Sequence, residues 1–129
     1  MINTNGLTIY TDGAARGNPG RGGYGAILMW KGDVKEISQG YTYTTNNRME
    51  LMSVIAALSS LKRPSLNIEI YSDSKYVVQA VMEKWLDKWI ATDFKGGKKN
   101  PDLWRTYYSL SREHQIKFIW VKGHASNPY

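Results

Sequence analysis

The hydrophobic pattern of this chain changes its period near residue 45, and the change requires a fold that combines strands with helices. Apolar and polar residues alternate over residues 7–10, and further strands are expected over about 22–30 and 34–42. From Met49 to Leu61, apolar residues instead recur with the spacing of one helix face. Short connections make the first three strands antiparallel neighbours.

The second half of the chain alternates strands with helices. The expected elements are a strand over 66–70 that stops at Tyr71–Asp73, a helix over Ser74–Met82, a helix that begins at Asn100–Pro101 and a strand over Ile116–Val121. A helical crossover lets the fourth strand lie parallel to the first, so that both end at the same edge of the sheet. The expected fold class is therefore α/β, with a mixed sheet flanked by helices.

Length and cysteine content narrow the kind of site that the chain can hold. Its 129 residues correspond to one domain, and none of them is a cysteine. Disulfides, cysteine-based zinc sites, iron–sulfur clusters and thiol catalysis are excluded, and only His114 and His124 can supply imidazole. Any bound metal is therefore expected to be held mainly by oxygen.

The charge of the chain favours an anionic partner. Lysine and arginine number 17 and aspartate and glutamate 11, and the net charge of +6 points first to nucleic acid. A basic domain without such a partner would carry the same charge. Residues 1–6 lack the features of a signal peptide, and no apolar run approaches the roughly 18 residues of a membrane helix. We therefore expect a cytoplasmic protein with no membrane partner.

Three acidic residues hold positions that would bring them together. Asp12 follows the first strand, Glu50 lies in the first turns of the long helix, and Asp73 follows the fourth strand. Parallel neighbouring strands would place Asp12 and Asp73 side by side at the edge where open α/β sheets bind ligands, with Glu50 facing them. Close carboxylates repel one another unless a cation lies between them, and Mg²⁺ or Mn²⁺ suits such oxygen ligands.

Each acid also has a purely structural explanation. Asp12 is a common type of turn residue, Ser72 or Asp73 can cap the following helix, and Glu50 can pair with Asn47 in a capping box. The joint placement of the acids favours the metal site over three separate structural roles.

Five segments stand out in order along nearly the whole chain. They are TDGAARGNPGRGGYGAIL (Thr11–Leu28), TTNNRMELMSVIAAL (Thr44–Leu58), IYSDSKYV (Ile70–Val77), NPDLW (Asn100–Trp104) and WVKGHASNP (Trp120–Pro128). Together they resemble type I ribonuclease H, and TTNNRMEL and WVKGHA are the specific signals. The resemblance implies a ribonuclease H-like, five-stranded mixed sheet of order 3-2-1-4-5. It also implies hydrolysis of the RNA strand of RNA–DNA hybrids, with 5′-phosphate and 3′-hydroxyl products.

The resemblance assigns catalytic roles to matching residues. Asp12, Glu50 and Asp73 become catalytic metal ligands, and His124 becomes a mobile histidine that assists proton transfer or product release. From the sequence alone, His124 could equally be an ordinary loop histidine after a strand. Two Mg²⁺ ions, or Mn²⁺, are expected with substrate, one to activate water and one to stabilise the leaving 3′ oxygen.

Further residues are expected to contact the hybrid. The matching positions are Gly13, Asn18, Thr45, Asn46, Asn47 and Lys75. The basic segment Lys84–Arg105 resembles the substrate-binding protrusion of the family, and its candidates are Trp85, Trp89, Lys95, Lys98 and Lys99. The asparagines also suit turns and caps, and the tryptophans, Trp104 included, also suit packing within the protein.

The sequence departs from the family after His124. Type I enzymes continue into a helix that carries a fourth catalytic aspartate, whereas this chain ends at Tyr129 with no acid after His124. A fragment, an incomplete sequence or a natural short form would explain the difference, and we expect a single truncated domain with impaired turnover. We also expect a monomer with no obligatory protein partner. The alternative functions are a non-catalytic hybrid-binding module and another nuclease on the same fold.

Overall fold

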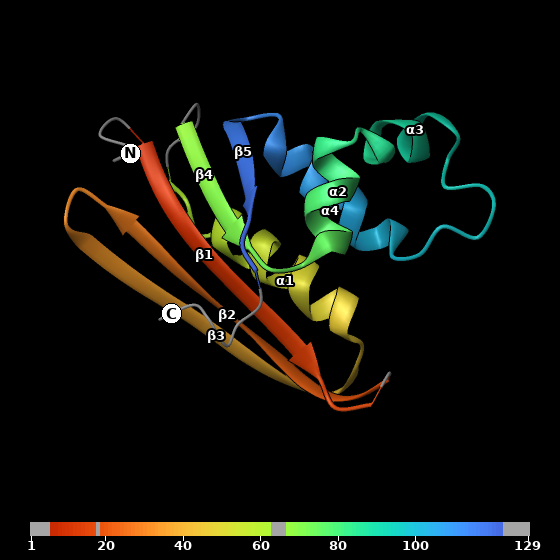
Figure 1. The fold of residues 1–129 in the computed structure, drawn as a ribbon, viewed down its shortest axis with the longest axis horizontal. Helices are drawn as coiled ribbons and strands as arrows, with labels where there is room; N and C mark the ends of the chain where they lie inside the picture. Colours follow the sequence, from red (N-terminus) through yellow and green to blue (C-terminus); the bar gives the residue numbers. More distant parts are fainter. Residues whose placement is uncertain (1–5, 18, 63–66, 123–129) are drawn as a thin grey trace.

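The computed structural model describes residues 6–17, 19–62 and 67–122, which contain a five-stranded sheet of order β3-β2-β1-β4-β5 (Figure 1). The strands are β1 (Gly6–Ala15), β2 (Gly20–Trp30), β3 (Asp33–Thr44), β4 (Asn67–Ser72) and β5 (Gln115–Trp120). The pairs β1–β2 and β2–β3 are antiparallel, and the pairs β1–β4 and β4–β5 are parallel. The expected fold class and strand order are confirmed.

The helices of the described residues pack on this sheet and on one another. They are α1 (Asn46–Ser59), α2 (Lys75–Met82), α3 (Trp85–Ala91) and α4 (Pro101–Ser111). Helix α1 lies along β1 and β2, and α4 lies against α1 (Figure 1). The alternating side chains of the strands and one face of α1 meet in a buried core, which includes Leu7, Ile9, Leu51, Val54, Leu58, Ile68, Ile70 and Trp104.

Side-chain caps define the start of α1 and α2. The sequence offers Thr45, Asn46 and Asn47 as caps for α1, and Thr45 is the cap, because its side chain accepts the N–H of Arg48 at 3.2 Å. At α2 the expectation of Ser72 or Asp73 is wrong, because the Oγ of Ser74 accepts the N–H of Val77 at 3.2 Å. Ser72 instead accepts the N–H of Ser74 at 3.1 Å and shapes the turn from β4 into the helix.

Two elements differ in extent from their sequence patterns. Asp12 lies inside β1 rather than after it, because the pairing with β2 continues to Ala15 and Gly22. Helix α1 starts before Met49 and ends before Leu61. The other strand limits differ from the expected ones by one or two residues. No helix in the part of the chain that the structure describes combines the length and apolar character of a membrane-spanning segment.

Candidate metal centre

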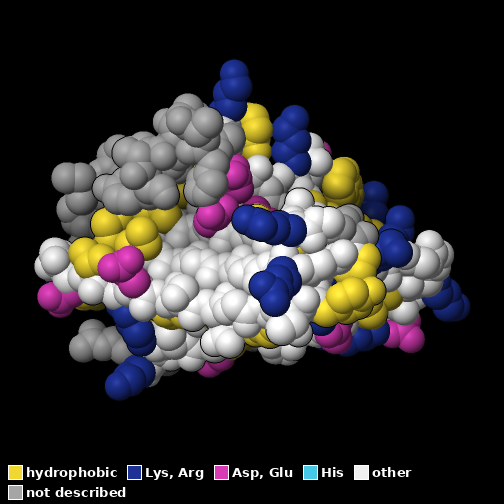
Figure 2. All heavy atoms as spheres, turned by 90° about the horizontal axis from the view of Figure 1, so that it is seen from below, with side chains coloured by type: hydrophobic (Ala, Val, Ile, Leu, Met, Phe, Trp, Pro, Cys, Tyr) yellow, Lys and Arg dark blue, Asp and Glu magenta, His cyan; other side chains and the backbone are white. Residues whose placement is uncertain are grey.

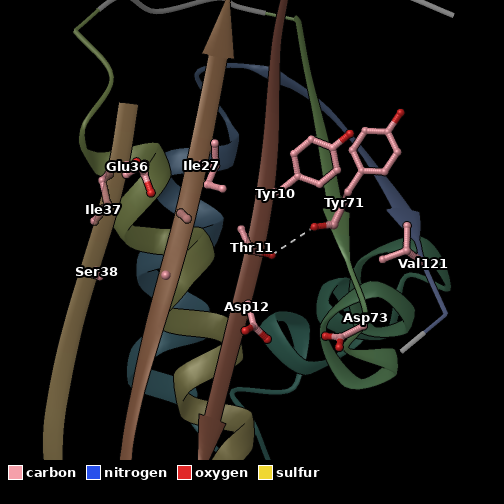
Figure 3. A pocket seen from close by; sticks show the side chains of 12 residues that line it. Tyr10, Thr11, Asp12, Ile27, Glu36, Ile37, Ser38, Tyr71, Asp73 and Val121 are labelled. Carbon is pink, nitrogen blue, oxygen red and sulfur yellow. Dashed lines mark hydrogen bonds between the residues drawn. The ribbon is translucent and has the colours of Figure 1, made fainter. Parts of the chain in front are cut away.

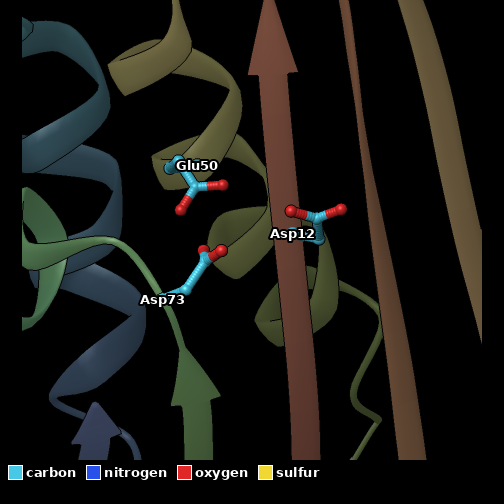
Figure 4. Close-up of side chains that lie close together, drawn as sticks. All are labelled: Asp12, Glu50 and Asp73. Carbon is cyan, nitrogen blue, oxygen red and sulfur yellow. The ribbon is translucent and has the colours of Figure 1, made fainter. Parts of the chain in front are cut away.

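Three carboxylates meet at the edge of the sheet where β1 and β4 diverge, as expected from their positions in the sequence. Asp12 extends from β1, Glu50 from α1 and Asp73 from the segment that follows β4 (Figure 4). Each contributes a carboxylate oxygen to a group whose members all lie within 4.8 Å of one another. Side chains from distant segments thus form one cluster of oxygen ligands.

The register of the parallel strands brings the two aspartates together. The pairing of β1 with β4 ends at Tyr10 and Tyr71, and each aspartate lies two residues beyond its tyrosine. Thr11 Oγ1 donates to the carbonyl of Tyr71 at 3.4 Å just before the strands diverge. Since side chains repeat every two residues along a strand, Asp12 and Asp73 leave the sheet on the same side as the stacked Tyr10 and Tyr71 rings.

Glu50 is placed by direct docking of α1 on β1. The N–H of Gly13 donates to Glu50 Oε1, and the N–H of Ala15 donates to Asn46 Oδ1 at 2.5 Å. Residues 13 and 15 share one side of a strand, and residues 46 and 50 share one face of a helix. Two residues along a strand and four along a helix both advance by about 6 Å, so the two pairs of groups can face each other. The capping-box explanation for Glu50 is therefore wrong: its carboxylate accepts from a strand, and Asn46 has a structural role as well.

Gly13 permits this docking because it has no side chain. A Cβ at this position would overlap the backbone of Met49 and Glu50. The glycine after Asp12 thus marks a close approach of helix to strand and not a turn. Its role in the structure is to position Glu50.

The electrostatics of the cluster favour a cation. Glu50 is only 8% exposed, and burial, followed by the charge of Asp73 and then that of Asp12, raises its pKa to about 8. The Gly13 N–H opposes the rise, but it is outweighed. A divalent cation would remove the repulsion, and the all-oxygen donor set fits a hard ion. The residues present therefore fit a metal site.

A hollow of about 250 Å³ lies beside the carboxylates (Figure 3). Asp12 and Asp73 lie at one end of it, and Tyr10, Tyr71 and Ile27 line the rest. The two rings stack with centroids 4.9 Å apart. This pair was not predicted from the sequence, although an aromatic residue two positions before Asp12 and before Asp73 was a signal for it.

The expected substrate-contacting residues near α1 and α2 are exposed or have structural contacts. Asn46 and Asn47 are exposed in the first turn of α1, beside the cap Thr45. Lys75 is exposed and its Nζ lies 5.2 Å from the ring centroid of Trp120, whose indole N–H donates to the carbonyl of Asp73 at 3.4 Å. Trp120 was not predicted for the site. Asn18 and His124 lie outside the described residues.

The basic segment forms one end of the molecule, where Figure 2 shows lysine and arginine side chains gathered on the right. Lys95, Lys98 and Lys99, called the loop lysines below, are exposed in the loop between α3 and α4. Trp104 is fully buried, and the ring centroids of Trp89 and Trp104 lie 5.9 Å apart. The expectation that these tryptophans pack within the protein is therefore confirmed for both. Trp85 is 40% exposed.

Comparison with known proteins identifies the family. A family model described as RNase H matches residues 4–129. The chain belongs to the ribonuclease H family. Its sequence is 49% identical over 126 residues to the ribonuclease H of Desulforamulus reducens, covering 95% of this chain and 79% of that protein. It is 50% identical over 128 residues to the ribonuclease HI of Synechocystis, with the same coverage of both chains.

Solved ribonucleases H share the fold. The crystal structure of LC9-RNase H1, a type 1 enzyme with the type 2 active-site motif, matches with a TM-score of 0.82 at 28% identity, covering 98% of this chain and 67% of that one. LC11-RNase H1, solved in complex with an RNA/DNA hybrid, matches with a TM-score of 0.73 at 24% identity, covering 95% and 88%. The predicted resemblance to type I ribonuclease H, and with it the expectation of a ribonuclease, is confirmed.

Proposed function

We propose that this ribonuclease H hydrolyses the RNA strand of RNA–DNA hybrids with Mg²⁺ as its metal ion, and that Mn²⁺ can replace it. The observation that carries the proposal is the cluster of Asp12, Glu50 and Asp73, whose oxygens lie within 4.8 Å of one another in a chain of this family. A structural relative that binds an RNA/DNA hybrid supports the choice of substrate.

The three carboxylates would hold the metal together with oxygens of the substrate phosphate. Two divalent ions bound there supply activation of water and charge stabilisation at the leaving oxygen. Glu50 Oε1 is held by the Gly13 N–H, and a bound cation would replace the hydrogen bond between the carboxyl groups of Glu50 and Asp73. With a pKa raised to about 8, Glu50 has to release its proton before it can act as an anionic ligand. His124 would assist proton transfer, and the products would carry 5′-phosphate and 3′-hydroxyl ends.

Recognition of the hybrid would use groups around this cluster. Asn46 accepts the Ala15 N–H through Oδ1, so its amide N–H groups can still donate to a ribose hydroxyl, and Asn47 is exposed beside it. Gly13, Thr45 and Lys75 complete the proposed contacts among the described residues, and Asn18 is proposed as a further contact from its position in the sequence alone. The loop lysines would contact phosphates farther along the duplex, with Trp85 beside them.

The proposal further includes that the protein acts as a monomer in the cytoplasm. All three carboxylates of the metal centre come from one chain, so no second copy is needed to complete it. The absence of cysteine fits a reducing compartment.

Cleavage of matched substrates tests the proposal. An RNA–DNA hybrid, a DNA duplex and single-stranded RNA of the same sequence are incubated with the protein in Mg²⁺ and in EDTA. We expect cleavage of the RNA strand of the hybrid alone and only with the metal. Asp12→Asn should lower the rate by about 100-fold or more while hybrid binding persists. Binding without cleavage by the unaltered protein would instead indicate a hybrid-binding module.

A further inference from the structure

A polar network joins α1 to the start of α4. Arg48 donates from both terminal nitrogens to the Asp102 carboxylate, at 3.2 Å (Nη1–Oδ1) and 2.9 Å (Nη2–Oδ2). Its Nη1 also donates to Asn100 Oδ1 at 3.0 Å. The hydroxyl of Tyr76 in turn accepts from the Asn100 amide at 3.1 Å and from the Trp104 indole at 2.7 Å. These five residues are called the Arg48 network below.

The donors and acceptors of this network match one another. Asn100 Oδ1 faces a guanidinium, which can only donate, and its Nδ2 faces a hydroxyl that accepts, so the amide has one satisfactory orientation. The Tyr76 hydroxyl donates to the carbonyl oxygen of Lys99, with 3.5 Å between the two oxygens. Asn100 also has a left-handed backbone, with φ of 61°, which asparagine tolerates better than most residues. Asn100 therefore suits the turn and the network together.

The network lies between two parts of the proposed substrate surface. On α1, Arg48 directly follows Asn46 and Asn47, and Glu50 lies two residues further on. On the other side, the loop lysines end at Lys99, directly before Asn100. The teal segment between α3 and α4 in Figure 1 is this loop, which extends beyond the helices.

The start of the loop is also tied to α4. Asp93 accepts a hydrogen bond in an ion pair with Arg105 of α4. The loop is thus held to α4 at its first residues and continues into α4 at its last. The Arg48 network adds directional polar contacts between this unit and α1.

Stability alone is a poor explanation for the network. The side chains of Arg48 and Asp102 are 34% and 62% exposed, and ion pairs this exposed contribute little to the free energy of unfolding. Their contact raises the pKa of Arg48 and lowers that of Asp102, so both partners stay charged at neutral pH. A bidentate guanidinium–carboxylate contact fixes both the distance and the relative rotation of its two side chains. Its main contribution here is therefore to the geometry of α1 and α4 and not to the free energy of unfolding.

We propose that the Arg48 network holds the loop lysines in register with the start of α1, so that a hybrid spanning both meets a prearranged surface. Arg48, Tyr76, Asn100 and Asp102 are then positioning residues, which act through the lysines and asparagines that touch the substrate. The inference rests on the proposed function, in which those groups contact the hybrid. Prearrangement lowers the ordering cost of binding and leaves the chemistry at the carboxylates unchanged.

The experiment measures KM and kcat for a long hybrid in Mg²⁺. Asn100→Gly keeps the left-handed turn and removes the bridging amide, and Asp102→Asn removes the ion pair. Each is made alone and together with alanine at the loop lysines. We expect each single variant to raise KM by about fivefold with kcat changed less than about twofold. Added to the alanine variant, each should raise KM by less than about twofold more, because lysines that are absent need no positioning.

A matched control separates positioning from charge. Asp87→Asn makes the same chemical change as Asp102→Asn, also at an exposed acid in the first turn of a helix near the loop. It should leave KM unchanged, and thermal unfolding should show every variant folded at the assay temperature. Multiplicative effects with the loop lysines, a loss confined to kcat, or an equal effect of Asp87→Asn would overturn the proposal.

The outcome for the unaltered protein tests the proposed function separately. If it binds the hybrid without cleaving it, the catalytic proposal fails, and equilibrium dissociation constants of the same variants replace KM. Effects on the dissociation constant that fall short of multiplying with those of the loop-lysine variant would still support the Arg48 network in its positioning role, and multiplicative effects would overturn it. Absence of hybrid binding would overturn both proposals.

Discussion

Replacement of Glu50 by glutamine should make the metal-free protein more stable at neutral and alkaline pH. Burial and the two neighbouring aspartates raise the pKa of Glu50 from 4.5 to about 8, so the folded state holds this proton more tightly than the unfolded chain. For a carboxyl with a raised pKa, the contribution to stability is complete below pH 4.5 and is lost as pH rises toward 8. Glutamine has no such proton and can still accept from Gly13.

The size of the effect follows from linkage. Between about pH 5 and pH 8, the free energy of unfolding should fall by about 3 kcal/mol more in the unaltered protein than in Glu50→Gln. The cost levels off above pH 8, where Glu50 is ionised in both states. A divalent cation stabilises the ionised carboxylate, so Mg²⁺ should shrink the difference between the two proteins.

Urea unfolding of both proteins at several pH values, in EDTA and in Mg²⁺, measures these differences. The subtraction cancels the titration of every other group that Glu50→Gln leaves unchanged. Parallel stability curves in EDTA would refute the account of the cluster, because they would mean that Glu50 titrates alike in the folded and unfolded states. A difference that persists in Mg²⁺ would show that the cation does not bind at Glu50.

Two other perturbations test how the site and its surroundings are built. Gly13→Ala should destabilise the protein by about 2 kcal/mol or more and abolish cleavage, because its Cβ would push α1 away from β1. Gly40→Ala, whose Cβ would meet only ordinary contacts, should change stability and cleavage little. Thermal unfolding and a hybrid cleavage assay measure both effects. Alanine at the loop lysines should weaken hybrid binding and reduce the magnitude of the slope of log K against log salt concentration by about 2 to 3. An unchanged slope would show that these lysines do not contact phosphates.

The fold and the acid cluster were predictable because their signals are local and repeat along the chain. Alternation and helical spacing predicted the elements, and a crossover between parallel strands predicted that Asp12 and Asp73 would share an edge. The structure adds the reason for their proximity: each lies two residues past the last parallel pair, Tyr10 and Tyr71. Register of this kind depends on packing of the whole sheet and is not visible in a single sequence.

Other features were misread or missed because local chemistry permits several roles. An aspartate followed by glycine suggested a turn, yet Gly13 lies inside β1 and makes room for α1. Three polar residues before α2 all suit a cap, and only the backbone geometry selects Ser74. Arg48 and Asp102 are 54 positions apart, with no periodic pattern that relates them.

The position of the Glu50 carboxylate depends on hydrogen bonds between α1 and β1 more than on the packing of the apolar core. Two strand N–H groups, from Gly13 and Ala15, bind two helix side chains, Glu50 and Asn46, so the third carboxylate is fixed by hydrogen bonds at the rim. A buried carboxyl beside two others opposes folding, and these bonds oppose that repulsion without an apolar contact. Conservative changes among the apolar residues deeper in α1, such as Val54 and Leu58, should therefore alter stability more than metal affinity. Changes at Gly13 should alter both, because the same residue admits the helix and holds its carboxylate.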